Sequence, residues 1–321
     1  MIVLDRLTKM FGSLTAVDGI SLRVAEGEVL GFLGPNGAGK TTTMRMIAGF
    51  LEPTAGSVAV CGFDLARHPI DAKRRIGYLP EGAPLYGDMT CRGFLNFVAD
   101  VRGFGAAERR RRIDEVVAMI ELAEVLDRPI ETLSKGFKRR VGLAQALIHD
   151  PAVLILDEPT DGLDPNQKHH VRALIRSMAA KKSIVVSTHI LEEVEAVCTR
   201  AVVIADGQLV ADGTAEQLLR RLPEHNAVIV DVPIGEAAIA RGALAALCDS
   251  EGTQLCETST DELASFRLIS RSPGGRQASL ADVAHCLKTT GVTIESLRCE
   301  RGRLDDVFRL LTTKTEVDHA A

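Results

Sequence analysis

One glycine-rich segment of the sequence has the residue types needed to hold phosphate groups. The pattern GxxxxGK[ST] lets successive backbone N–H groups turn toward phosphate oxygens. We expect the Lys40 ammonium to reach the β- and γ-phosphates of a nucleotide and the Thr41 hydroxyl to bind Mg²⁺. The expected ATP-binding residues of this loop are Gly34, Pro35, Asn36, Gly37, Ala38, Gly39, Lys40, Thr41 and Thr42.

The sequence on either side of this loop supports the same interpretation. Val29–Leu33 is an apolar run of strand length, and Thr41–Phe50 has the pattern of a helix. The start of such a helix presents the positive end of its dipole to a bound anion. A chance match in an unrelated loop is the alternative, and the strand–loop–helix context argues against it.

A second candidate site is an acidic pair. The apolar run Ala152–Leu156 leads directly into Asp157 and Glu158. Carboxylates at the end of a buried parallel strand lie on the ligand-binding edge of the sheet. We expect Asp157 to contact Mg²⁺ and Glu158 to act as the general base that polarises the attacking water. Two acidic residues that cap the next turn would be the plainer interpretation of this pair alone.

The elements that must position these residues alternate between strands and helices. Val29–Leu33, Ala152–Leu156 and Ser183–Ser187 are apolar without alternation, which is typical of parallel strands buried on both faces. The sequence therefore predicts an α/β fold of the P-loop NTPase type. Helical patterning dominates the intervening part, about 88–150, which we interpret as a helical insertion. Its helices are expected at Phe94–Val101, Arg109–Ala123 and Lys138–His149.

The sequence changes character after Leu222. The predicted order of later elements is β-α-β-β-α-β, the ferredoxin-like pattern. We therefore divide the chain into an ATPase domain, 1–222, and a small α+β accessory domain, 223–321, with a polar tail from Thr312. Catalytic residue types do not cluster there, so an interaction role or a small-molecule sensor is expected. The predicted elements are Ala227–Val232, Glu236–Cys248, Thr253–Glu257, Ser265–Ser270, Ala278–Thr289, Val292–Leu297 and Leu304–Leu311.

Composition narrows the classes of protein. The 321 residues carry a formal net charge of -5, and an acidic balance argues against nucleic acid as a partner. The seven cysteines are scattered without a CxxC pair, which is typical of a reducing compartment. We see neither a signal-peptide pattern nor a run of the roughly 18 apolar residues that a membrane span needs. A cytoplasmic location is expected.

Further motifs identify a family by resemblance. The signature of the ABC transporter ATP-binding subunits resembles Leu133-Ser134-Lys135-Gly136-Phe137, and their D-loop resembles Asp161-Gly162-Leu163-Asp164-Pro165. Ser187-Thr188-His189 ends a strand as the switch histidine of that family does. Phe11 is similarly placed to the aromatic that stacks on adenine, and Glu81 lies where the family has its Q-loop glutamine. The resemblance covers residues 1–215 in the correct order.

The resemblance implies a composite site. Ser134 and the Gly136 backbone N–H open a helix and would bind the γ-phosphate of ATP held by a second subunit, with Asp164 at the same shared site. His189 would donate a hydrogen bond to the γ-phosphate and help to place the water. A chain with one phosphate loop and one signature therefore needs a second ATPase subunit, most simply another copy of itself.

Three residues depart from the family pattern. Glu81 replaces glutamine, Lys135 replaces the first signature glycine, and Phe137 replaces the signature glutamine. Together with Leu304–Phe308 they resemble the bacterial ABC-2-type exporters of the drug-resistance and gliding-motility-like subgroup. Glu81 keeps an oxygen ligand for Mg²⁺ but adds a negative charge.

The subgroup resemblance implies an ATPase that acts on a separate polytopic membrane permease and lies on the inner face of the membrane. The alternative is a non-transport ABC ATPase that acts on nucleic acid or the ribosome. Such proteins carry tandem ATPase domains or long coiled-coil insertions, which we do not find in this sequence.

Overall fold

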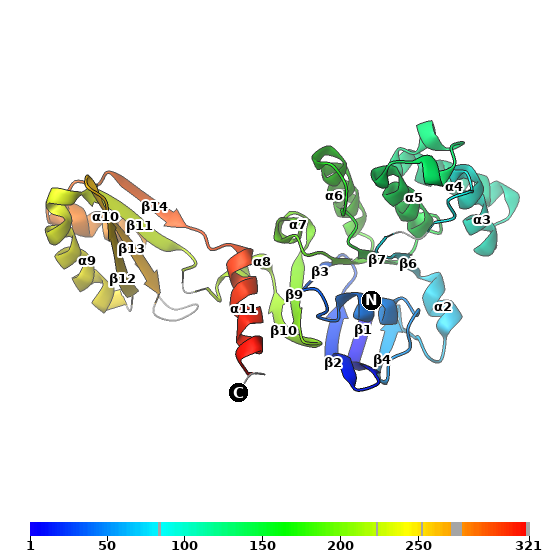
Figure 1. Ribbon diagram of the computed structural model, residues 1–321, viewed down its shortest axis with the longest axis horizontal. Helices are drawn as coiled ribbons and strands as arrows, with labels where there is room; N and C mark the ends of the chain where they lie inside the picture. Colours follow the sequence, from blue (N-terminus) through cyan, green and yellow to red (C-terminus); the bar gives the residue numbers. More distant parts are fainter. Residues whose placement is uncertain (83–84, 223, 252, 271–277, 319–321) are drawn as a thin grey trace. The chain divides into compact units, whose positions relative to one another are not determined.

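The computed structural model describes residues 1–82, 85–222, 224–251, 253–270 and 278–318. Within these ranges the chain forms two compact units, Met1–Asp212 with residues 315–318, and Gly213–Lys314. Figure 1 shows their elements in sequence colours. The division falls at the end of a strand, β10, somewhat before Leu222, where the sequence changes character.

The first unit is organised around a six-stranded sheet in the order β10-β9-β3-β8-β7-β6. Strand β3 pairs in parallel with β8 and β9, and β7 pairs in parallel with β6 and β8. This confirms the parallel sheet that the apolar runs predicted. The strands are β3 (Val29–Leu33), β6 (Ile76–Leu79), β7 (Val153–Asp157), β8 (Ser183–Ser187), β9 (Arg200–Ala205) and β10 (Gln208–Gly213).

Successive residues of these strands enter two different cores. On β7, Leu154 and Leu156 pack into the cluster formed with the helices of the insertion, whereas Val153 and Ile155 pack into a second cluster. The second cluster lies against a four-stranded antiparallel sheet in the order β2-β1-β4-β5. Because side chains alternate across a strand, burial on both faces needs an apolar residue at every position. These outer strands are β1 (Ile2–Phe11), β2 (Leu14–Val24), β4 (Ala55–Val60) and β5 (Phe63–Asp64).

Three helices of the first unit, α3, α5 and α6, begin at residues whose side chains cap them. Thr90, Ser134 and Asp164 are N-caps whose side chains accept a hydrogen bond from the first helical turn. The insertion contains α3, α4 and α5, as predicted, and Figure 1 shows them grouped together. The helices are α1 (Lys40–Ile47), α2 (Pro69–Arg74), α3 (Cys91–Val101), α4 (Ala106–Ile120), α5 (Lys135–Leu147), α6 (Pro165–Ala179) and α7 (Leu191–Val197); short 3₁₀ turns are η1 (Ala123–Val125) and η2 (Ile130–Thr132).

The second unit has the predicted β-α-β-β-α-β order. Its antiparallel sheet runs β12-β13-β11-β14, the strand order of a ferredoxin-like fold. Alternate residues of β11 and β13, such as Val230 and Phe266, pack against Leu244 of α9 and Leu287 of α10. The elements are α8 (Ala215–Leu219), β11 (Ala227–Pro233), η3 (Ile234–Glu236), α9 (Ala237–Glu251), β12 (Thr253–Ser259), β13 (Leu263–Ser270), α10 (Leu280–Thr289), β14 (Ser296–Glu300) and α11 (Leu304–Asp318).

Two predicted elements of the second unit were wrong in their bounds. The strand expected at Val292–Leu297 begins at Ser296, because the Thr293 amide donates to the Glu236 carboxylate, 2.6 Å away, and not to a neighbouring strand. The apolar residues that suggested the earlier start are Val292, which is buried, and Ile294, which packs against the core.

The second wrong bound is the end of the helix predicted at Leu304–Leu311. Helix α11 continues through Thr312 to Asp318, and the Thr312 hydroxyl donates back to the Phe308 carbonyl at 2.8 Å.

Candidate functional site

The glycine-rich loop joins β3 to α1 in the conformation that its glycines permit. Gly37 and Gly39 have φ of 84° and 101°, in the region that side chains rarely adopt. A Cβ atom at Gly39 would lie 2.4 Å from the Ala16 carbonyl oxygen, and one at Gly34 would lie 2.4 Å from that of Ile204. Gly39, the N-cap of α1, has no side chain to cap the helix. The first N–H groups of α1 are therefore left for a ligand, as an anion-binding helix start requires.

Lys40 is the buried cation of this loop. Its Nζ donates to the carbonyl oxygens of Gly34 at 2.7 Å and Pro35 at 2.9 Å, which holds the side chain along the loop. Burial lowers the pKa of Lys40 from its ordinary value, while nearby carboxylates, that of Glu158 foremost, act in the opposite direction. The ammonium group is thus close to acidic residues that are distant from Lys40 in the sequence.

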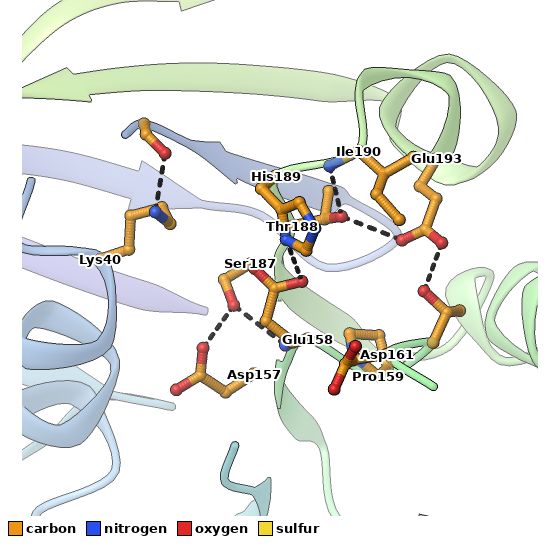
Figure 2. A network of polar contacts seen from close by, with 12 residues as sticks. Lys40, Asp157, Glu158, Pro159, Asp161, Ser187, Thr188, His189, Ile190 and Glu193 are labelled. Carbon is orange, nitrogen blue, oxygen red and sulfur yellow. Dashed lines mark hydrogen bonds and ion pairs between the residues drawn. The ribbon is translucent and has the colours of Figure 1, made fainter. Parts of the chain in front are cut away.

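Asp157 ends β7 with one oxygen bonded and the other free. Its side chain is 1% exposed, and its Oδ1 accepts a hydrogen bond from the Ser187 hydroxyl (Figure 2). Its Oδ2 is buried and has no hydrogen-bond partner among the described residues. A buried carboxylate oxygen with no donor is unfavourable unless a cation or water satisfies it. Asp157 therefore fits the predicted role as a metal ligand.

The other two predicted Mg²⁺ ligands lie near Lys40. Thr41 is half-buried in the first turn of α1, and the Glu81 carboxylate is close enough to affect the pKa of Lys40. Within the described ranges no group of three or more His, Cys, Asp or Glu residues could hold a metal ion alone. Mg²⁺ is commonly held by one or two protein ligands together with substrate phosphates.

Glu158 and His189 form a pair at the edge of the sheet. Glu158 Oε2 lies 3.0 Å from His189 Nδ1, and the Glu158 side chain is 14% exposed against 59% for the histidine (Figure 2). Burial raises the pKa of Glu158, and the hydrogen bond with His189 opposes that change. Glu158 has φ of 51°, and its amide donates to the Ser187 hydroxyl at 3.1 Å. A carboxylate with a raised pKa beside an orienting histidine is suited to act as a general base.

A buried carboxylate behind His189 was missed in the sequence. Glu193 on α7 is 4% exposed and accepts hydrogen bonds from the hydroxyls of Thr160 and Thr188. The Thr188 hydroxyl also accepts from the Ile190 amide at 3.0 Å (Figure 2). Arg172 lies 3.6 Å from Glu193. Glu193 thus connects the turn after Glu158 to the segment that carries His189.

Sequence periodicity offered a signal for Glu193. Ile190, Val194 and Val197 recur at helical spacing, and Glu193 falls on the same face of that pattern. An acidic residue on an apolar helix face is expected to be buried and bonded. The Ser187 hydroxyl gave no such signal, because its partner Asp157 lies on a different strand.

The predicted signature residues contact a different part of the chain. Ser134 caps α5 and accepts from the Phe137 amide at 3.3 Å. Lys135 Nζ pairs with Asp161 at 2.9 Å, and a Cβ atom at Gly136 would lie 2.4 Å from Gln167 Oε1. The start of α5 is therefore held against the loop that leads into α6, and not against the Lys40 loop of the same chain.

Asp164 and Phe11 occupy two further positions. Asp164 is the N-cap of α6 and accepts from the Gln167 amide at 2.9 Å. Phe11 ends β1 with its side chain 48% exposed, and the Lys9 ammonium lies 5.2 Å from the centre of its ring. The structure thus brings together Lys40, Asp157, Glu158 and His189, whereas Ser134, Gly136 and Asp164 gather around the start of α5 and α6.

The chain is similar to known ATP-binding proteins. A family model described as ABC transporter matches residues 17–161. The daunorubicin resistance ATP-binding protein DrrA3 of Streptomyces coeruleorubidus is 36% identical over 312 residues, 97% of this chain and 95% of that protein. The Nod factor export ATP-binding protein I of Paraburkholderia xenovorans (strain LB400) is 42% identical over 216 residues, 67% of this chain and 71% of that protein.

A solved structure is similar as well. It is the dimeric structure of a post-hydrolysis state of the ATP-binding cassette MJ0796, bound to ADP and Pi. The TM-score is 0.62 at 25% identity, over 67% of this chain and 98% of that one. None of the helices in the described ranges has the length and apolar character needed to cross a bilayer. On these similarities, the chain belongs to the ABC transporter family, among the ATP-binding subunits of exporters.

Proposed function

We propose that this chain hydrolyses ATP with Glu158 as the general base. The observation that carries the proposal is the 3.0 Å contact between Glu158 and His189 beside the free, buried oxygen of Asp157. Glu158 takes a proton from the attacking water, and His189 holds the Glu158 carboxylate in place and faces the γ-phosphate. Lys40 and the first amides of α1 bind the phosphates. Phosphoryl transfer depends mainly on such positioning and on charge stabilisation.

Mg²⁺ is the proposed metal, with Thr41 and Asp157 as its ligands and Glu81 as a candidate third. When bound, the ion would neutralise charge on the β- and γ-phosphates. The Ser187 hydroxyl orients Asp157 so that the unbonded Oδ2 remains available. Phe11, as an exposed aromatic near the start of the unit, is the proposed stacking partner of the adenine ring.

Two chains are proposed to share each nucleotide. Ser134 and Gly136 lie at the start of α5, where Ser134 accepts from the Phe137 amide and Gly136 lies against Gln167. They would bind the γ-phosphate held by the other subunit, with Asp164 at the same interface. The similar MJ0796 cassette is dimeric in its post-hydrolysis state, which supports this arrangement. A homodimer is its simplest form.

The proposed membrane partner has a candidate docking groove on the first unit. A hollow of about 820 Å³ is lined by exposed apolar side chains, including Tyr86 and Phe97, which are 57% and 43% exposed. Exposed aromatic residues at a concave surface commonly mark a protein interface. Its basic rim favours an amphipathic segment with acidic residues from the permease. The rim and floor include Ile70, Lys73, Arg74, Val101 and Arg102.

This assignment makes the chain a peripheral subunit on the inner face of the membrane. The names of the relatives concern export and resistance, which favours a transporter over an ATPase that acts on nucleic acid or the ribosome. The proposed ATPase domain is 1–222, with the helical subdomain at about 88–150, and the proposed accessory domain is 223–321.

The first test addresses the permease. Tagged Glu158→Gln protein is used to recover partners from detergent-solubilised membranes of the source organism, with identification by mass spectrometry. We expect a polytopic membrane protein, and we expect Phe97→Asp in the same background to lose it. Ile239→Asp, at an exposed apolar position on α9, is the matched control. Recovery of ribosomal proteins or nucleic acid without a membrane protein would overturn the transporter assignment.

The second test addresses hydrolysis and dimerisation. Glu158→Gln should bind ATP while turnover falls by about 10²–10⁴-fold, because a general base contributes that much to the rate. The variant should accumulate as a dimer with Mg·ATP, measured by light scattering. A monomer with bound nucleotide would contradict the shared site, and an unchanged rate would contradict the role of Glu158.

A further inference from the structure

The side chain of one arginine of α5 contacts the backbone at the end of β7, where Asp157 and Glu158 lie. Arg139 is 6% exposed, and its guanidinium donates to carbonyl oxygens of two separate loops. One is Pro80, at 3.1 Å, which directly precedes Glu81. The others are the three consecutive carbonyls of Asp157, Glu158 and Pro159, the last at 3.4 Å. These contacts involve backbone oxygens only.

The carbonyls bound by Arg139 flank a strained residue. Glu158 has φ of 51°, in the left-handed region that costs a non-glycine residue roughly 1–2 kcal/mol. Arg139 Nη2 donates to the carbonyls of both Asp157 and Glu158, on either side of this residue. Strained backbone persists only where surrounding contacts hold it. Arg139 supplies such contacts from one side, and Ser187 supplies them from the other through the Glu158 amide.

The positive charge of Arg139 lies close to several carboxylates of the site. Burial lowers the pKa of Arg139, and the carboxylates of Asp161, Asp157, Glu158 and Glu81 act in the opposite direction. A cation is thus buried behind the acidic side of the site. A planar guanidinium has five donors in a fixed fork, whereas a lysine ammonium has three on a flexible stem. Only the guanidinium matches several carbonyls that diverge from one point.

We propose that Arg139 is a positioning residue for hydrolysis. It fixes the backbone of Glu158 so that the carboxylate meets His189, and it holds the Glu81 loop to the same point. It acts through Glu158, because its guanidinium donates to backbone carbonyls on both sides of that residue. This inference rests on the proposed role of Glu158 as the general base.

Turnover and nucleotide affinity together distinguish a positioning role of Arg139 from a merely structural one. A loss of folding would lower nucleotide affinity and turnover together. A displaced Glu158 lowers kcat and leaves ATP binding at the Lys40 loop intact, because that loop makes its own contacts. A displacement of about 1 Å in a reacting group can cost on the order of 10²-fold in rate.

The experiment compares Arg139→Lys and Arg139→Gln with Arg176→Lys. Arg176 also donates to a backbone carbonyl, that of Ala196 at 2.7 Å, and serves as the matched control. We expect kcat for ATP to fall by about 10²-fold in both Arg139 variants. The ATP affinity by calorimetry should stay within about twofold, and Arg176→Lys should leave kcat within the same limit. Thermal unfolding checks that each variant is folded. Equal losses of affinity and kcat would overturn the proposal.

A double-mutant cycle with Glu158→Gln makes the test specific. If Arg139 acts through Glu158, Arg139→Lys should change the residual turnover of Glu158→Gln by no more than about twofold. A fall of about 10²-fold in that background, as in the wild-type chain, would overturn the inference while the role of Glu158 stood. If Glu158→Gln itself left turnover unchanged, the proposed function would fail first.

Discussion

The two units of this chain differ in the kind of polar side chain that they bury. In the first unit the buried side chains include four ionisable ones, Lys40, Arg139, Asp157 and Glu193. Among the described side chains of the second unit, the buried polar ones are Thr253 and Ser270, which are neutral. Both units are sheets covered by helices, so secondary structure does not account for this difference.

The difference follows from the direction of the strands. The first unit has parallel strands whose carboxyl ends meet at one edge, and Asp157 and His189 follow two neighbouring strands there. The second unit has antiparallel strands, and its charged residues form half-exposed pairs such as Arg298 with Asp231 at 2.6 Å. Burying a charge costs stability unless it is paired. The first unit bears that cost at the residues that we propose for ATP hydrolysis.

The largest expected difference in stability between the two units comes from Glu193→Ala. It removes a buried carboxylate from two threonine hydroxyls and Arg172, so we expect the first unit to lose about 3–5 kcal/mol of unfolding free energy. Urea unfolding followed by hydrogen exchange resolves the two units. Glu193→Gln, which keeps an acceptor, should lose less. Equal losses for the two variants would show that the charge of Glu193 is not what matters.

Acid should weaken the first unit through a buried histidine. Burial lowers the pKa of His149 to about 4, and its Nε2 lies 2.9 Å from the Ile76 carbonyl. Between pH 6.5 and 4 the unfolded chain gains a proton at this histidine and the folded chain does not. The first unit should therefore lose roughly 3 kcal/mol of stability as pH falls through this range.

In the second unit burial also lowers the pKa of His225, and the carboxyl of Asp231 titrates at still lower pH. Hydrogen bonds from Ser265 and Ser296 lower the pKa of Asp231 to about 2, so its contribution is lost only as pH falls from about 3.8 toward 2. Urea titrations at a series of pH values, with hydrogen exchange for each unit, check these losses. His149→Gln should remove the loss from the first unit, and a flat stability of the wild-type first unit from pH 6.5 to 4 would refute it.

Lys40→Ala tests whether the buried charges of the first unit bind the nucleotide. We expect ATP affinity to fall by about 10- to 100-fold, since hydrogen bonds to charged groups contribute roughly 1.5–3 kcal/mol. Isothermal titration calorimetry measures the change. Lys288→Ala, at an exposed position on α10, is the matched control and should leave the affinity unaltered. A weak effect of Lys40→Ala on ATP affinity would show that the phosphates bind elsewhere.

The smallest effect is expected from Glu257→Gln in the second unit. Glu257 pairs with Arg241 at 2.6 Å, and the arginine side chain is 57% exposed. Such surface pairs contribute about 0–1 kcal/mol, so unfolding of the second unit should hardly change. A loss comparable to that of Glu193→Ala would remove the contrast between the units.

Much of the fold could be predicted from local sequence patterns. The bounds of β3 and β8 agree with the apolar runs Val29–Leu33 and Ser183–Ser187, because strands buried on both faces leave an uninterrupted signal. The start of β14 was misplaced, because Val292 and Ile294 pack against the core without joining the sheet. Periodicity reports burial, and it does not report which backbone groups pair.

The site was predictable only where a motif carries its own chemistry. The residue types and their order in the phosphate loop and the acidic pair indicated the roles that we propose for them. Arg139 lies in the basic run Lys138–Arg140, and sequence alone does not tell which of these side chains points inward. Its partners are backbone carbonyls, which every residue has, so no pattern of side chains could identify them. Long-range contacts of this kind require the tertiary structure.

The left-handed backbone at Glu158 has a consequence for protein engineering. Glycine adopts this conformation without steric cost, so Glu158→Gly should relieve strain while it removes the carboxylate. A library selected for thermal stability alone would therefore favour inactive proteins at this position. Any attempt to make this subunit more robust should hold residue 158 fixed and seek its gains in the second unit.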